Sequence, residues 1–213
     1  MTLTPGLRRF ALTLHIVASV GWVGAVAGFL ALALAGLASS NAQLVRASYI
    51  AMNLIYRSVV VPLGLASLTT GVVSSLGTEW GLVRHYWVLV KLLVTVPAVF
   101  LMLVHVQPVE RMAEAAASET WSGVDPAELR IQLMVYAATA LQVLLVATAL
   151  STYKPRGKTP YATRELQEWS VPHQRGFAAA GDRPATGYKA VVAVLALIVL
   201  VFTTAHLAGL HRH

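Results

Sequence analysis

The length of its apolar runs most constrains what this chain can fold into. A transmembrane α-helix needs roughly 20 mostly apolar residues, and runs of this length recur along the sequence. We predict spans at about residues 10–37, 48–76, 86–106, 131–150 and 190–210. The predicted fold class is therefore all-α: a polytopic membrane helical bundle with five transmembrane helices, forming a single integral membrane domain over residues 1–213.

Composition supports this class. Apolar residues make up 57% of the chain and charged residues only 12%, which leaves too little polar surface to cover a soluble globule. The first apolar run is too long for the hydrophobic region of a signal peptide, so we expect a retained helix. The chain has no cysteine, which excludes disulfides, thiolate metal sites and cysteine nucleophiles.

The distribution of basic residues predicts the orientation. With the N-terminus in the cytoplasm, ten Lys and Arg residues fall in cytoplasmic segments and four in outer ones, which places the C-terminus outside. The basic loop over residues 151–188 is then cytoplasmic, and the acidic loop over 107–129, with a short surface helix at "RMAEAAASE", is outside. The net charge of +7 does not indicate a nucleic-acid partner, because the basic residues are not interleaved with aromatic ones.

Two ionisable residues are predicted at the same inner depth. His15 lies about five residues into the first span, roughly 8 Å from its cytoplasmic end. Lys91 lies equally far into the third span, which runs in the same direction. Trp22 follows His15 by seven residues and shares its helix face. Such groups at membrane depth usually face a bundle interior, although His15 could instead make a packing hydrogen bond and Lys91 could snorkel.

A second pair is predicted near the outer surface. His105 closes the third span and His206 lies near the end of the fifth, so both rings reach the same outer level. Arg57 lies about ten residues in from the outer side, within reach of an anionic group held between them. Two imidazoles and an arginine suit b-type haem, which has an apolar body and anionic propionates. Interfacial histidines and a snorkelling arginine are the alternatives.

Other chemistries fit the residues less well. Imidazole and thioether ligands suit copper, but the chain has only five methionines, of which Met102 alone lies one turn from His105. No Asp or Glu lies within the spans to act as a base for zinc hydrolysis. "GAVAG", residues 24–28, is a GxxxG pattern and predicts a close helix contact.

Short motifs resemble those of two groups of small bacterial membrane proteins. In the HemJ-type protoporphyrinogen oxidases a histidine precedes a tryptophan by seven residues, as His15 and Trp22 do in "LHIVASVGWVG". A later tryptophan precedes a lysine by four, as Trp87 and Lys91 do in "WVLVKLLV". "VVVPLGLASLTTG" followed by "KLLV" is also similar to the CopD-like copper-resistance proteins and a related uncharacterised group. The similarity covers the first three spans.

The resemblance to the HemJ-type family implies haem binding through His15 and Lys91. The chain departs from that family where "GFLALALAGLASSN" stands in place of a proline-arginine element. We therefore expect a protein with one or two b haems that performs electron transfer or haem-linked oxidoreduction in the bacterial inner membrane. Its expected partners are lipid, a quinone or a redox partner protein, and further copies of itself. A CopD-like copper-handling protein and a cofactor-free structural subunit remain alternatives.

Overall fold

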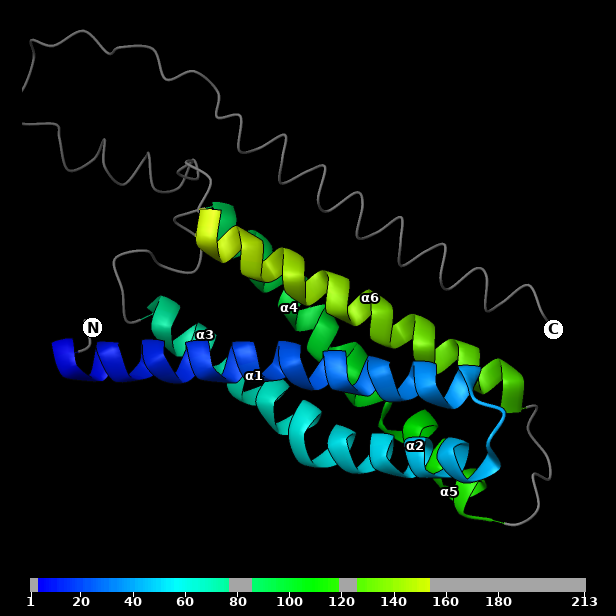
Figure 1. The fold of residues 1–213 in the computed structure, drawn as a ribbon. Coiled ribbons are helices and arrows are strands. Elements are labelled where there is room, and N and C mark those ends of the chain that lie inside the picture. Colours follow the sequence, from blue (N-terminus) through cyan, green and yellow to red (C-terminus); the bar gives the residue numbers. More distant parts are fainter. Residues whose placement is uncertain (1–3, 77–85, 119–125, 154–213) are drawn as a thin grey trace, which may run out of the picture.

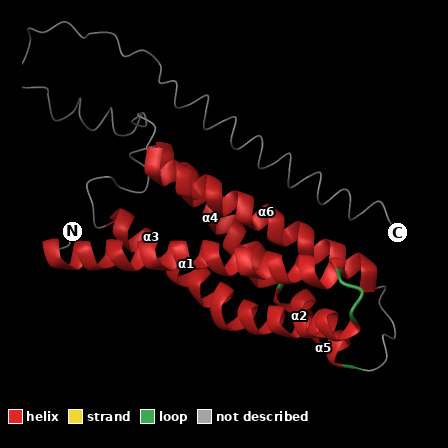
Figure 2. Cartoon of the chain, viewed as in Figure 1, coloured by secondary structure: helices red, strands yellow, loops and turns green. Residues whose placement is uncertain are grey.

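The computed structural model describes residues 4–76, 86–118 and 126–153 of the 213-residue chain. All the regular structure in these ranges is helical, as Figure 2 shows. The elements are α1 (Pro5–Ala38), α2 (Ala42–Ile55), η1 (Tyr56–Val60), α3 (Val61–Leu76), α4 (Tyr86–Val104), α5 (Val106–Ala117) and α6 (Pro126–Tyr153).

Within the described residues, four long helical segments are apolar and long enough to cross a membrane. They correspond to the first four predicted spans and comprise Pro5–Ala38, Ala42–Leu76, Tyr86–Ala117 and Glu128–Thr152. The fifth predicted span and the C-terminus lie outside the described residues. So does the predicted cytoplasmic loop, except that its first three residues continue α6.

Side chains at the turn between α1 and α2 explain why the two helices form a hairpin. Helix α1 ends at Ala38, where Ser39 adopts an extended conformation. Asn41 then caps α2, because its side-chain oxygen accepts hydrogen bonds from the backbone N–H groups of Gln43 and Leu44 at 2.9 and 3.3 Å. The short connection returns the chain along α1, and Figure 1 shows the two helices side by side.

The second long segment bends at η1, a turn of π-helix between α2 and α3. Pro62 has no N–H to donate to the carbonyl of Ser58, and its ring crowds that carbonyl. The backbone widens instead, and the N–H of Val61 donates to the carbonyl of Tyr56, five residues earlier. In Figure 1, α2 and α3 point in visibly different directions on either side of this turn.

The third long segment is interrupted at His105, between α4 and α5. Pro108 lacks an N–H for the carbonyl of Val104, which accounts for the break at this point. Helix α5 carries the predicted surface-helix sequence but begins earlier than expected, at Val106. Val109 and Met112 are buried where α5 packs on α2. His105 is therefore held at a helix junction.

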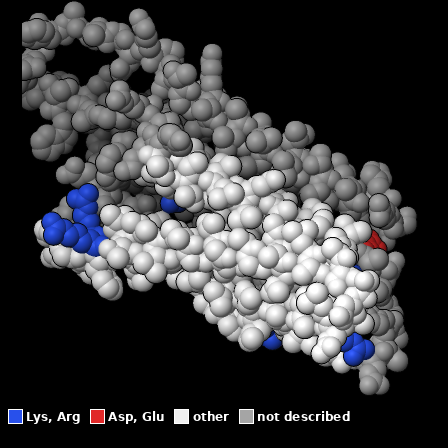
Figure 3. Space-filling model, in the orientation of Figure 1, with Lys and Arg blue, Asp and Glu red and all other residues white. Residues whose placement is uncertain are grey.

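The outer faces of the helices are apolar, as contact with lipid requires. Large side chains such as Phe10, Val20, Leu54 and Phe100 are each more than 60% exposed. In Figure 3 basic side chains gather where α1 begins, and the long face beyond them is mostly uncharged. The pattern is that of a bundle whose sides meet a bilayer and whose ends meet water.

The prediction of a close helix contact at "GAVAG" is wrong for the described part of the chain. A Cβ atom added at Gly24 or Gly28 would meet no heavy atom within 4 Å. Both glycines face away from the neighbouring helices, because the buried face of α1 runs through Trp22 and Phe29 instead. The α1 glycine in closest contact is Gly36, where an added Cβ would lie 2.7 Å from the Tyr49 ring.

Candidate functional site

His15 is held in one orientation by helix α3. Its Nδ1 atom lies 3.0 Å from the carbonyl oxygen of Ser67 and 3.2 Å from Oγ1 of Thr70. The Thr70 hydroxyl donates its own hydrogen to the carbonyl of Ala66 at 2.5 Å, so it accepts from the ring. A carbonyl oxygen can only accept, and Nδ1 therefore carries the proton. The lone pair of the neutral imidazole is then on Nε2.

Lys91 of α4 contacts the other nitrogen of this ring. Its Nζ atom lies 3.2 Å from Nε2 of His15, so the structure brings these two predicted residues together. One of the two nitrogens must supply a lone pair for this hydrogen bond, and the pair therefore carries at most one positive charge. No Asp or Glu among the described residues forms an ion pair with Lys91.

Small residues on α3 make room for the ring. A Cβ atom at Gly71 would lie 3.0 Å from Cε1 of His15, so the imidazole occupies the space that a side chain there would need. The Ser19 and Ser67 hydroxyls are hydrogen-bonded to each other at 2.8 Å, one turn further along. We call His15, Ser19, Ser67, Thr70 and Lys91 the inner polar cluster.

The inner polar cluster connects α1 to α4. No pair of Cα atoms from these two helices comes within 8 Å, so side chains make the contact between them. Helix α3 packs against both of them, and so does α6. The hydrogen bond between His15 and Lys91 thus bridges two helices whose backbones are held apart by their neighbours.

Trp22 lies two turns beyond His15 on the same face of α1, as the sequence predicts. Its side chain is only 4% exposed. Gly64 of α3 makes room for it, because a Cβ atom there would lie 3.0 Å from Cε2 of Trp22 and 2.8 Å from Sδ of Met102. The indole Nε1 is buried and has no hydrogen-bond acceptor among the described residues.

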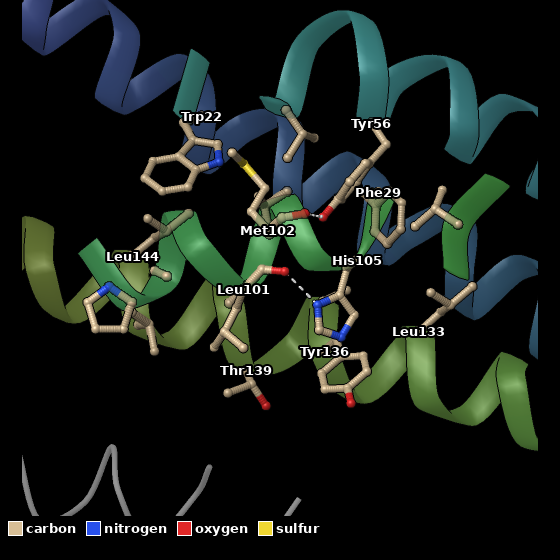
Figure 4. A pocket seen from close by; sticks show the side chains of 18 of the residues that line it. Trp22, Phe29, Tyr56, Leu101, Met102, His105, Leu133, Tyr136, Thr139 and Leu144 are labelled. Carbon is tan, nitrogen blue, oxygen red and sulfur yellow. Dashed lines mark hydrogen bonds between the residues drawn. The ribbon is translucent and has the colours of Figure 1, made fainter. Parts of the chain in front are cut away.

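A cavity of about 320 Å³ lies beside Trp22, between α1, α4 and α6. Its walls come from α1, η1, α4, α5 and α6 and are mostly apolar. Figure 4 shows its aromatic side chains together with the hydrogen bonds that use the wall's polar atoms. The polar or aromatic residues that line it are Trp22, Phe29, Tyr56, His105, Tyr136 and Thr139.

His105 is the histidine in this wall. Its Nδ1 donates to the carbonyl of Leu101 at 2.6 Å, which leaves the lone pair on Nε2. The ring packs edge-on against Tyr136 of α6, with centroids 3.8 Å apart and planes inclined at 68°. The predicted partner, His206, lies outside the described residues, so the outer pair stays a prediction.

Arg57 does not line this cavity. Its guanidinium forms an ion pair with Glu110 of α5 at 2.8 Å, and the two side chains are 55% and 34% exposed. Sequence reasoning missed Glu110 as a partner because it assigned the acidic residues of the third loop to the outer surface as a group. The structure joins η1 to α5 through this pair.

Sequence reasoning also missed the α3 residues that hold His15. The run "SLTTG" contains Ser67, Thr70 and Gly71, and small and polar residues in an apolar span are the signal that could have indicated them.

The described residues contain no group of three or more His, Cys, Asp or Glu side chains placed to hold a metal ion. Comparison with known proteins gives no match to any family model, curated protein or solved structure.

Proposed function

We propose that the protein binds b-type haem in its helical bundle through His15 and serves electron transfer or a haem-linked oxidation in the membrane. The observation that carries this proposal is the orientation of His15. A histidine that ligates a metal almost always donates its other ring N–H to a carbonyl or carboxylate. The His15 ring does so to Ser67 and presents Nε2 to Lys91 of α4.

Lys91 is the second residue that suits this group. Its Nζ atom lies 3.2 Å from Nε2 of His15, so the two nitrogens meet between α1 and α4. As a neutral amine, Lys91 would be a ligand; as an ammonium, it would pair with a propionate. Bound haem would supply a one-electron carrier, and the chain's own groups would fix its position.

The alternatives explain less of the cluster. A copper site of the CopD kind would favour thioethers, but no methionine belongs to the inner polar cluster. Ionisable groups are costly at bilayer depth. A cofactor-free structural subunit would give no functional reason for a histidine and a lysine there. We place the protein in the bacterial inner membrane, with five spans, and expect a quinone or redox protein as its electron partner.

Absorption spectroscopy of the purified protein tests the proposal. We expect a Soret band and, after reduction with dithionite, an α band, with haem and iron both near one per chain. His15→Ala should lose this spectrum. His85 directly precedes the third predicted span, and His85→Ala should keep the spectrum. Protein purified without haem from haem-replete cells, or a His15→Ala variant with an unaltered spectrum, would contradict the proposal.

A further inference from the structure

The cavity beside Trp22 holds a hydrogen-bond donor that the protein does not use. Trp22 is 96% buried, and its Nε1–H has no acceptor among the described residues. Leaving a buried N–H unpaired costs free energy, and such groups are rare in folded proteins. Because Trp22 lines the cavity, a bound molecule with an acceptor atom would supply the missing partner.

The remaining polar atoms of the wall restrict what that molecule is. The Tyr56 hydroxyl already donates to the carbonyl of Met102 at 2.6 Å, and Nδ1 of His105 already donates to Leu101. Nε2 of His105 keeps a lone pair, on a different wall from Trp22 in Figure 4. The Tyr136 hydroxyl accepts from Nε2 of Gln132 at 3.2 Å, and Thr139 adds a second hydroxyl to the lining. The cavity therefore presents the Trp22 donor on one wall and acceptor atoms on others, with aromatic rings around them.

We infer that this cavity binds the ring of a lipid-soluble quinone, with Trp22 donating to one of its carbonyl oxygens. The flat ring matches aromatic walls, and its two oxygens point in opposite directions. In the quinol form, a hydroxyl would donate to Nε2 of His105. The volume of about 320 Å³ lies at the lower end of the range for small-molecule sites. A lipid-soluble ligand is also available to helices whose outer faces are apolar.

A second haem suits the cavity less well than a quinone. Haem propionates need cationic partners, and no Lys or Arg is among the described residues that line the cavity. Arg57, the predicted partner, is paired with Glu110 instead. An acyl chain would fill apolar space but would leave Nε1 of Trp22 unpaired. The quinone accounts for both the apolar wall and the unused donor, and it deepens the proposed function by naming its electron partner.

Binding is tested in lipid nanodiscs by calorimetry with decylubiquinone, using decylbenzene as a probe of similar shape without an acceptor. We expect decylubiquinone to bind at least tenfold more tightly. Trp22→Phe keeps an aromatic ring and loses the N–H, so it should weaken quinone binding about tenfold, the value of one hydrogen bond. Trp87→Phe, outside the cavity wall, is the matched control and should bind as the native protein does.

Three results would overturn the inference. Equal affinity for decylbenzene and decylubiquinone would identify a site for acyl chains. This comparison uses only the native protein, so it holds even if Trp22→Phe does not fold. Unchanged quinone affinity in a folded Trp22→Phe protein would show that the Trp22 N–H does not donate to the quinone. Loss of a haem from His105→Ala would assign the cavity to a second haem. Haem content, measured on the same samples, separates these results from a failure of the haem proposal itself.

Discussion

The Nε2 atom of His15 lies 3.2 Å from the Nζ atom of Lys91, although 76 positions separate the two residues in the sequence. This contact joins α1 to α4, whose Cα atoms nowhere approach within 8 Å. Lys91 reaches across with its long side chain, and His15 is fixed from behind by Ser67. His15 is therefore the fixed member of the pair and Lys91 the flexible one. A ligand that binds between them would require Lys91 to move and His15 to stay in place.

Substitution of Lys91 separates ligation from charge. If the neutral amine ligates iron, both Lys91→Met and Lys91→Arg should lose most of the bound haem, because neither replacement offers an amine lone pair. If the ammonium pairs with a propionate, Lys91→Arg should keep the haem and only Lys91→Met should lose it. Haem per chain and the position of the reduced α band measure the difference. Full haem occupancy in Lys91→Met would remove Lys91 from the site.

Gly71 provides a test of the space around His15. An added Cβ would lie 3.0 Å from Cε1 and 3.3 Å from Nδ1 of the ring, so Gly71→Ala should push the imidazole off its hydrogen bond to Ser67. Overpacking of this kind typically costs 1–3 kcal/mol. We expect Gly71→Ala to reduce haem per chain severalfold and to lower the thermal unfolding temperature.

Gly24→Ala is the matched control for that substitution. It makes the same change of residue on a helix, but its Cβ meets no heavy atom within 4 Å. Both variants gain the same intrinsic helix propensity, about 1 kcal/mol for Gly to Ala in a helix interior. Equal haem content in the two variants would show that the ring has room to move and that its orientation is not important.

The sequence was sufficient to predict the first four spans, because apolar runs must be helical in lipid, whatever packs against them. It also predicted the common depth of His15 and Lys91, since depth follows from helix rise alone. It was harder to predict which face of each helix packs against its neighbours. The GxxxG pattern at Gly24 and Gly28 describes a close contact only if a neighbour packs there, and no described helix does.

The cavity was out of reach of sequence reasoning for a different reason. It is lined by residues of α1, η1, α4, α5 and α6, and the irregular backbone at η1 and at His105 belongs to its wall. These are consequences of packing among several helices. The proline positions indicate where irregular backbone can occur, but not the direction in which each segment then runs. The unused donor of Trp22 depends on the same packing.

The ion pair between Arg57 and Glu110 makes a prediction that differs from the sequence-based one. Arg57 lies 19 residues before Leu76, roughly 29 Å of helix rise, which is close to the thickness of a bilayer core. At such an interface, with side chains 55% and 34% exposed, we expect a coupling of about 0.2–1 kcal/mol in a double-mutant cycle. Arg57→Ala, Glu110→Ala and the double variant, compared by thermal unfolding, provide this value.

The same variants address the predicted role of Arg57 toward a propionate. Because its guanidinium already has Glu110 as a partner, we expect Arg57→Ala to keep its haem. A loss of haem in Arg57→Ala but not in Glu110→Ala would show instead that the arginine serves the cofactor.

Orientation is the last prediction, and the absence of cysteine makes it simple to measure. Arg8 and Arg9 lie in the first turns of α1, and the positive-inside rule places that end in the cytoplasm. Single cysteines at Thr4 and Ser40, both exposed, then lie on opposite sides of the membrane. A membrane-impermeant maleimide applied to intact spheroplasts should label Ser40→Cys and not Thr4→Cys, and detergent should make both reactive. The opposite labelling would mean a reversed chain. A periplasm-dependent reporter fused after His213 completes the test: activity is expected for five spans, and inactivity would indicate an even number.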